Sequence, residues 1–239
     1  MSSIVTSGTI TQMALQMHYK QFKQDDPKLL KTLIEAFPFA TIAANGDESP
    51  MVAYAPIMLN GNIIEFHLAK ANVVTTHMKN GTKLTILIND IGAHISPSWY
   101  KTRFSGINPD RSKTAPTYDY INANLCGCAK IMHISQLQEH LKELVDTHEP
   151  VDGWKFDEID TDIFNKWCEN IIGFYMPIES FSITTKLSQE QNIADKDGII
   201  AGLRNRGTFS DVALAKIIEI YDGTSKSLNS ALKTLVYKF

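Results

Sequence analysis

Two short segments of the chain combine aromatic rings with hydroxyl groups, and proline punctuates both. Residues 94–100 read His-Ile-Ser-Pro-Ser-Trp-Tyr and residues 115–120 read Ala-Pro-Thr-Tyr-Asp-Tyr. Aromatic faces beside hydroxyl and amide groups suit a flat polar ligand, which stacks on the rings and forms hydrogen bonds at its edges. A protein core or a subunit interface uses the same residue types. The two segments therefore indicate a ligand site or a dimer seam, and the two can coincide.

A second candidate is an anion site around residues 66–74, which read Phe-His-Leu-Ala-Lys-Ala-Asn-Val-Val. A strand ends near Ala69, and Asn72 can cap the helix that follows. Free backbone N–H groups in the first turn of that helix attract an anion, and Lys70 adds a positive charge beside them. The alternative is an ordinary capped helix with a surface lysine, and His67 can equally be a half-buried strand side chain.

The composition is that of a globular protein, with 44% hydrophobic and 21% charged residues among 239. A net charge of -3 argues against nucleic-acid binding that is driven by the overall charge of the domain. A local basic patch remains, formed by Lys101, Arg103, Arg111 and Lys113 between the two aromatic segments. This loop is either simply solvated or placed to meet a phosphate-bearing ligand.

The cysteines favour a reducing compartment. The chain has three, and Cys126 and Cys128 alternate on a predicted strand, so both point to one face. Without further ligands at metal-binding spacing, the pair is a weak metal signal and is interpreted as reduced packing residues. No apolar run reaches membrane-spanning length, and no secretory signal precedes the fold. We therefore expect a cytoplasmic protein with no metal and no membrane contact.

Several elements are needed to position these residues, and their order predicts an α+β fold. Asp26 and Pro27 open a helix that Pro38 ends. Asn45-Gly46 and Asn60-Gly61 separate short apolar runs and are typical of tight hairpin turns. Strands are predicted at residues 39–44, 51–59, 62–69, 83–89, 92–96, 118–133 and 171–183. Helices are predicted at residues 72–80, 136–148 and 161–170, from a Ser188 cap through 203, from a Ser210 cap through 221, and at 225–237. Strands that follow one another in hairpins, with helices at the periphery, indicate a small antiparallel barrel.

The order of these pieces resembles the PaiB family of FMN-binding negative transcriptional regulators. The matching segments run in order over most of the chain, from about residue 19 to 203. They are residues 26–38, 67–72 (His-Leu-Ala-Lys-Ala-Asn), 94–100, 115–120, 172–179 (Ile-Gly-Phe-Tyr-Met-Pro-Ile-Glu), 186–189 (Lys-Leu-Ser-Gln) and 198–203 (Gly-Ile-Ile-Ala-Gly-Leu). The Ile-Ser-Pro-Ser-Trp-Tyr run is the most specific of them.

This resemblance implies an antiparallel FMN-binding split β-barrel with peripheral helices, working as a homodimer with flavin near the subunit seam. Lys70 and Asn72, beside His67, would serve the FMN phosphate. The ring or dimer side would be lined by Ser96, Ser98, Trp99, Tyr100, Thr117 and Tyr118. The chain departs from the family pattern at Val73, Tyr118, Asp119, Asn124 and Cys126. If those positions shape the pocket, FMN binding is weakened.

The resemblance divides the chain into a leading segment 1–18, a split-barrel FMN-binding domain 19–206 and a helical C-terminal extension 207–239. It implies a negative transcriptional regulator, which would meet DNA through a local basic patch or through a partner protein. One alternative is an FMN-dependent oxidoreductase, since a cofactor can carry the chemistry without an obvious catalytic triad. Another is a cofactor-free binding or assembly module on the same fold.

Overall fold

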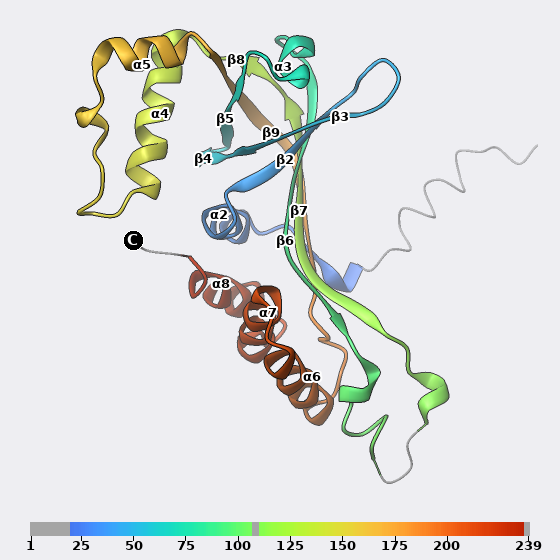
Figure 1. The fold of residues 1–239 in the computed structure, drawn as a ribbon. Coiled ribbons are helices and arrows are strands. Elements are labelled where there is room, and N and C mark those ends of the chain that lie inside the picture. The colour runs from blue at the N-terminus through green and yellow to red at the C-terminus, as the bar shows by residue number, and fades with distance from the viewer. Residues whose placement is uncertain (1–19, 107–109, 237–239) are drawn as a thin grey trace, which may run out of the picture.

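A curled antiparallel sheet organises the chain (Figure 1). This computed structural model describes residues 20–106 and 110–236, and within them nine strands pair in the order β3-β2-β6-β7-β9-β5-β4, with β1 and β8 also paired to β9. The strands are β1 (Lys23–Gln24), β2 (Phe39–Ala44), β3 (Met51–Pro56), β4 (Met58–Asn60), β5 (Ile63–Ala69), β6 (Lys83–Ile95), β7 (Thr117–Cys128), β8 (Lys130–Ile131) and β9 (Ile171–Lys186). Every pairing is antiparallel, which confirms the predicted antiparallel barrel fold.

Seven α-helices and four short 3-10 helices accompany the sheet in the described residues. They are α2 (Pro27–Ala36), α3 (Val73–His77), α4 (Ile134–His148), α5 (Thr161–Cys168), α6 (Ile193–Arg206), α7 (Phe209–Ile220) and α8 (Ser225–Lys233), with η1 (Lys20–Phe22), η2 (Pro97–Trp99), η3 (Arg111–Lys113) and η4 (Phe156–Glu158). Figure 1 shows α2, α6, α7 and α8 on one side of the long strands β6 and β7. The segment from α4 to α5 projects from the same side at the opposite end of the molecule.

Local signals set the first helix and one hairpin as predicted. Asp26 caps α2 by accepting a hydrogen bond from the N–H of Lys28, and Pro27 occupies the first turn. Gly61 takes a left-handed φ of 61° in the tight turn between β4 and β5. The hairpin of β2 and β3 also forms, although residues 45–50 make a longer loop than the expected two-residue turn. Gly81, a few residues after α3, has a left-handed φ of 91°.

Three predicted boundaries were wrong because long-range pairing overrode local signals. The run 51–59 divides into β3 and β4, since Ile57 donates its N–H to the carbonyl of Pro38 instead of continuing the strand. The runs 83–89 and 92–96 form the single strand β6. The helix predicted at 72–80 is shortened to α3, whose first turn is capped by Asn72.

The predicted serine caps of the C-terminal helices were also wrong. Asn192 caps α6 through the N–H of Asp195, and Thr208 caps α7 through the N–H of Asp211. Ser188 instead lies in the left-handed region with a φ of 51°. The last helix is α8, which is capped by Thr224 and ends at Lys233. The predicted helix 225–237 was too long, because residues 234–236 form a turn, and residue 237 lies outside the described residues.

Burial on the long strands is one-sided. The inner side chains of β6 alternate as Leu84, Ile86, Ile88, Ile91, Ala93 and Ile95, and all are buried. The opposite face, which we call the outer face, carries the cross-strand row Tyr54, Thr41, Leu87, Asn124 and Ser182. None of this row is fully buried, and no helix of the described ranges packs over it. The sheet therefore has one face in the core and one face without a cover.

The C-terminal helices complete the inner core. Leu203, Leu214 and Leu228 are fully buried in the same hydrophobic cluster as the sheet. The backbone of η2 meets α6 so closely that a Cβ atom at Gly198 would lie 1.9 Å from the carbonyl oxygen of Trp99. The indole of Trp99 fills the space that a side chain at Gly202 would need. The proposed division at residue 207 stays a prediction, since α7 and α8 share this core.

We expect Gly198→Ala to destabilise the protein by about 2 kcal/mol or more, because rigid backbone atoms leave no room for the added methyl group. Ala201→Ser on the exposed side of α6 is the matched control and should change the free energy of unfolding by less than about 0.5 kcal/mol. Urea unfolding followed by circular dichroism measures both. Equal stabilities for the two variants would show that α6 does not pack on η2 in this way.

Candidate functional site

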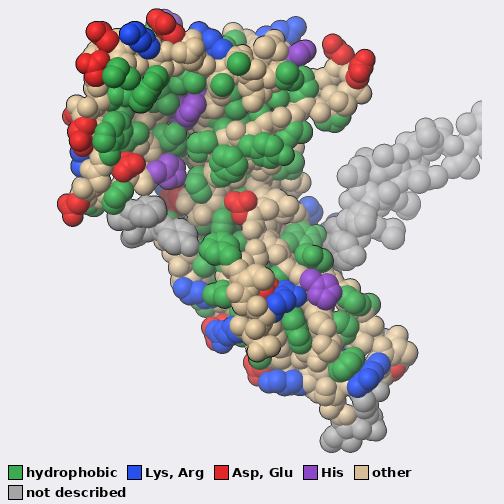
Figure 2. Space-filling model, viewed as in Figure 1, with side chains coloured by type: hydrophobic (Ala, Val, Ile, Leu, Met, Phe, Trp, Pro, Cys, Tyr) green, Lys and Arg blue, Asp and Glu red, His purple; other side chains and the backbone are tan. Residues whose placement is uncertain are grey.

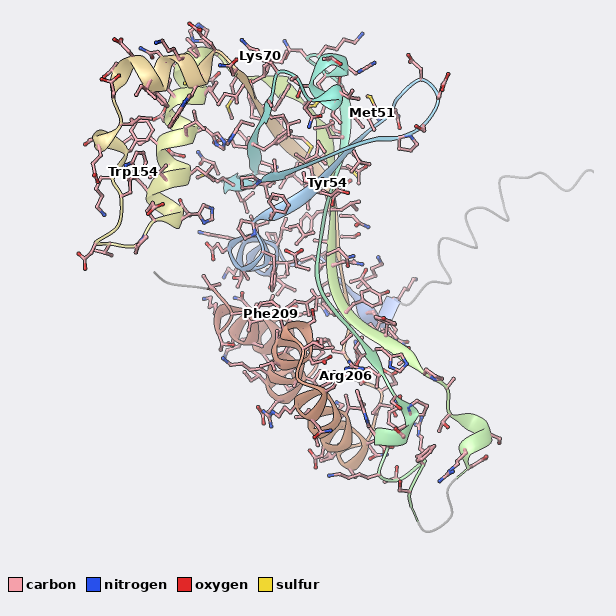
Figure 3. All side chains as sticks on the ribbon, viewed as in Figure 1. Met51, Tyr54, Lys70, Trp154, Arg206 and Phe209 are labelled. Atoms are coloured by element: carbon pink, nitrogen blue, oxygen red, sulfur yellow. The ribbon has the colours of Figure 1, made fainter. Side chains whose placement is uncertain are left out.

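The residues predicted to hold a phosphate lie at the start of β9. The N–H of Lys70 donates to the carbonyl of Asn170, immediately before that strand. The Asn72 side chain accepts from the N–H of Val74 at 2.9 Å, which confirms its capping role. Lys70 is exposed and forms no ion pair with a described residue, and Figure 3 places it at the end of the molecule where α3 and β5 meet. Its ammonium group is free to meet an anion.

The residues predicted to line a ring lie at the other end of β9. Lys186, its last residue, donates through Nζ to the carbonyl of Tyr118 at 2.6 Å and to Oγ1 of Thr117 at 2.5 Å. Tyr118 is 59% exposed on the outer face, and its ring meets that of His94 edge-on at 6.0 Å. β9 spans sixteen residues, or roughly 50 Å of strand. One mononucleotide therefore cannot contact Lys70 and Tyr118 of the same subunit.

The segment 96–100 is turned partly toward its own subunit. The hydroxyls of Ser96 and Ser98 lie 2.7 Å apart, and Ser96 caps η2. Trp99 packs against α6, with the guanidinium of Arg206 over its ring at 5.0 Å. Tyr100 is only 4% exposed. The structure thus leaves Ser98 and Tyr118 exposed, whereas Trp99 and Tyr100 bind the loop to the helices.

A cavity of about 430 Å³ opens on the outer face beside Tyr118. Its lining residues are Asn89, Asp90, Gly92, Tyr118, Tyr120 and Asn122. The Oδ1 atom of Asn122 is buried there without a hydrogen-bond partner among the described residues. Burial raises the pKa of the Asp90 carboxyl above its usual value. Because a buried acceptor without a partner is costly, the cavity is suited to a ligand that offers an N–H or O–H donor.

A β-bulge creates this cavity. Between Ile88 and Ile91, β6 carries one more residue than the β7 segment that pairs with it. The extra residue turns Asn89 and Asp90 out of the ladder, and bulges of this kind often lie beside functional sites. These two residues and Asn122 were not among the site residues predicted from the sequence. The available signal was the pair Asn89-Asp90, which breaks the alternation of apolar residues on either side.

A buried polar cluster fixes the end of β9 next to the cavity. Asp119 is fully buried, and Ser188 donates its hydroxyl to Oδ2 of Asp119 at 2.5 Å. Lys186 lies 3.4 Å from the other carboxylate oxygen. Burial raises the pKa of the Asp119 carboxyl, while these two donors oppose that rise. The cluster explains the Lys-Leu-Ser-Gln segment, since Gln189 also bonds the backbone of Leu187 and Thr185.

His67 faces α4 rather than the anion site. Its Nδ1 lies 3.2 Å from Nε2 of the buried His140, and Nδ1 of His140 lies 3.6 Å from Oε2 of Glu65. Burial, reinforced by His140, lowers the pKa of His67 to about 4. This arrangement attaches α4 to β5, so His67 holds a structural contact in the described subunit.

The positions where the chain departs from the family pattern fall mainly on exposed surfaces. Tyr118, Asn124 and Cys126 lie on the outer face, and Cys126 lies beside Thr85 at 3.8 Å. Val73 is 64% exposed at the start of α3. Cys126 and Cys128 share a face of β7 as predicted, and all three cysteines are free. No group of His, Cys, Asp and Glu within the described ranges is arranged to hold a metal ion.

The fold of this chain is similar to that of solved structures of other proteins. Two solved structures share this fold, the flavocytochrome Anf3 from Azotobacter vinelandii and an FAD- and heme-binding protein from Mycobacterium smegmatis. The first has a TM-score of 0.56 at 16% identity and covers 70% of this chain and 71% of its own. The second has a TM-score of 0.51 at 16% identity and covers 75% and 80%. This likeness shows a shared fold, the antiparallel split barrel.

The family follows from the sequence match. The model described as "Putative FMN-binding domain" matches residues 17–180, and the chain belongs to this family. Protease synthase and sporulation protein PAI 2 of Bacillus subtilis is 22% identical over 209 residues, covering 84% of this chain and 95% of that protein. The uncharacterized protein AN0679 of Emericella nidulans is 25% identical over 232 residues, covering 83% and 90%. The resemblance to the PaiB family is confirmed, and family membership supports a flavin cofactor.

The residues at the bulge fit the ring of a flavin. An isoalloxazine ring offers one N–H donor between carbonyl acceptors at its edge, and Asn122 Oδ1 is a buried acceptor that lacks a partner. Tyr118 supplies an exposed aromatic face, and Gly92 carries no side chain that would crowd the cavity.

Among the helices in the described ranges, none has the length and apolarity needed to cross a bilayer.

The low pKa of His67 predicts a particular acid sensitivity. An unfolded histidine takes up a proton near pH 6.5, whereas folded His67 resists protonation down to about 4. Its contribution to stability is therefore present above pH 6.5 and lost as the pH falls toward 4. We expect His67→Gln to show a smaller loss of unfolding free energy across this window than the wild type. The exposed His77→Gln serves as control, and an unchanged slope in His67→Gln would contradict the assignment.

Proposed function

We propose that the protein is an FMN-binding homodimer of the PaiB type that acts as a negative transcriptional regulator in the cytoplasm. Family membership and the uncovered outer face support this proposal most directly. The outer face carries the stacked pair Phe39 and Tyr54, whose side chains are 57% and 62% exposed. Exposed apolar surface of this kind is typical of an interface. Three free cysteines agree with a reducing compartment.

The flavin ring lies at the seam between the two subunits. Tyr118 provides the stacking surface, Asn122 accepts from the ring N–H, and Ser96, Ser98 and Thr117 supply hydroxyl groups nearby. Trp99 and Tyr100 hold this loop in place through their contacts with α6 and the core. When bound, FMN supplies reversible electron or hydride transfer. The subunit's own residues orient the ring and exclude water from one of its faces.

The phosphate end is held by Lys70 and Asn72 of the second copy. Within one subunit these residues lie at the opposite end of β9 from Tyr118, so an antiparallel pair of copies related by a two-fold axis is the arrangement that brings both groups to one ligand. Lys70 provides the charge, and Asn72 orders the first turn of α3. The proposed site is therefore complete only in the dimer.

A flavin-dependent oxidoreductase is the second candidate. The cavity beside the bulge is open to solvent on the outer face and contains Asp90, whose raised pKa suits a proton donor or acceptor. Consumption of reduced nicotinamide in the presence of FMN would favour this candidate. Salt-sensitive binding to promoter DNA would favour the regulator, acting through a local basic patch or through a partner. The third candidate, a cofactor-free module, requires that FMN does not bind.

We expect Lys70→Glu to weaken FMN binding about tenfold or more, because loss of one charge-assisted contact costs about 1.5–3 kcal/mol. The stability of the protein should change little, since Lys70 is exposed. Titration of FMN fluorescence measures the affinity. Lys79→Glu, at another exposed lysine after α3, is the matched control and should bind FMN nearly as the wild type does. Equal affinities for wild type and Lys70→Glu would refute the phosphate assignment.

The dimer is tested separately by light scattering. We expect the wild type to be dimeric at micromolar concentration and Tyr54→Glu to shift toward the monomer, because the new charge would be buried in the seam. Phe209→Glu is the control, since Phe209 is similarly exposed but lies on the helical side, as Figure 3 shows. A monomeric wild type, or a monomer produced equally by both substitutions, would count against pairing through the outer face.

A further inference from the structure

Charge is segregated along the chain. Residues 132–170, which contain α4, η4 and α5 and which we call the acidic segment, carry ten acidic and three basic side chains. The rest of the chain carries sixteen acidic and twenty basic side chains. One of the three lysines, Lys155, is engaged with the carbonyls of Pro150 and Val151. The acidic segment therefore has a strongly negative surface on a protein that is otherwise weakly positive.

The acidic segment also exposes large apolar side chains. Ile163 and Trp167 lie one helical turn apart on α5 and are 46% and 58% exposed. Asn165, between them in sequence, points to α4 and accepts a hydrogen bond from Gln138. Ile163 and Trp167, which we call the α5 stripe, thus face away from the helix that supports α5. Figure 2 shows hydrophobic side chains gathered over this end of the molecule, with acidic side chains at their edge.

The burial of the segment confirms that it is a surface projection. Within α4 and α5 only Leu137, His140 and Cys168 are fully buried. The aromatic pair Phe156 and Phe164, with ring centroids 4.9 Å apart, fills the space inside the segment. These contacts hold α5 in place without using the α5 stripe. An exposed tryptophan and isoleucine are then not required for the packing of this subunit.

The position of the segment leaves it accessible when two copies pair. α4 and α5 project from the same side of β6 and β7 as α2, α6, α7 and α8 in Figure 1, away from the outer face. A second copy seated on the outer face would not cover them. The α5 stripe is therefore a separate surface from the proposed dimer seam.

We propose that the α5 stripe is a docking site for a positively charged amphipathic segment of another protein. The apolar stripe needs an apolar partner, and Asp160, Asp162 and Glu169, which lie on α5 or at its ends, outnumber the single basic residue of that helix, Lys166, and attract lysine and arginine. Nucleic acid and anionic lipid carry the same sign as the acidic segment and are repelled. An amphipathic helix with an apolar stripe and a basic rim meets both requirements. This surface goes beyond flavin binding, and neither depends on the other.

Docking buries the ring of Trp167 and the side chain of Ile163, while the acidic rim sets the orientation and speeds the encounter. The contact is expected to weaken as salt is added but to persist at physiological ionic strength, because the apolar part is not screened. A site made of charge alone would be lost under the same conditions. This difference separates specific docking from general attraction to an acidic protein.

The test uses a helical fourteen-residue leucine–lysine peptide as probe, with a serine–lysine peptide of the same charge as control. Isothermal titration is performed on the full chain at 0.15 M salt. We expect the leucine–lysine peptide to bind and Ile163→Ser with Trp167→Ser to weaken binding at least tenfold. Asp162→Lys with Glu169→Lys should also weaken it. Ile193→Ser on α6, where the side chain is 81% exposed, and Asp47→Lys with Glu48→Lys in the β2–β3 loop should leave it unchanged.

Several results would overturn the proposal. These are absence of binding by the leucine–lysine peptide, equal binding by the serine–lysine peptide, and equal effects of the α5 and control substitutions. Binding of duplex DNA that is lost in the α5 variant would assign the surface to nucleic acid instead. FMN titration of the Ile163→Ser, Trp167→Ser variant should match the wild type. That measurement separates failure of this docking site from failure of the flavin assignment.

Discussion

The one-sided burial of β6, β7 and β9 is the constraint on which the rest of the structure depends. The inner side chains of these strands meet α7 and the other helices in a continuous core, so the strands must keep their register along their whole length. A slip by one residue would exchange the inner row for the outer row. The outer face is consequently fixed as well, although nothing in the described subunit covers it. Its aromatic, amide and hydroxyl groups are presented as a rigid surface, which is what a planar cofactor at a subunit seam requires.

Two features shape that surface, one in the middle of β6 and one at the end of β9. The bulge in β6 turns Asn89 and Asp90 out of the ladder and opens a cavity beside Asn122. The cluster of Asp119, Lys186 and Ser188 then ties the end of β9 to β7 from the inner side. Because Asp119 is buried and bonded to both partners, it is well placed to hold the strand that carries Tyr118. The chain departs from the family pattern at this position, and the Asp119 carboxylate supplies the negative charge that Lys186 meets here, so the departure has a local structural role.

Some of this structure could be predicted from the sequence and some could not. The cap and proline at Asp26 and Pro27, and the turn at Gly61, are local signals that need no distant partner, and they were predicted correctly. Asn89-Asp90 has the local character of a turn, yet β7 pairs on both sides of it and absorbs the extra residue as a bulge. Ser188 is a residue type that often caps a helix, but its hydroxyl donates a hydrogen bond to Asp119, which is distant in sequence. The family resemblance predicted the candidate residues as one group. Only the length of β9 reveals that Lys70 and Tyr118 belong to different ends of the subunit.

A crystal structure of the protein grown with FMN tests the central claim most directly, namely that the outer face holds the flavin at a seam between two copies. The account predicts the ring against Tyr118, with a ring nitrogen within hydrogen-bond distance of Asn122 Oδ1 and the phosphate near Lys70 of the second copy. A flavin bound on the helical side would contradict it. So would a flavin held entirely by one subunit whose outer face remains in solvent.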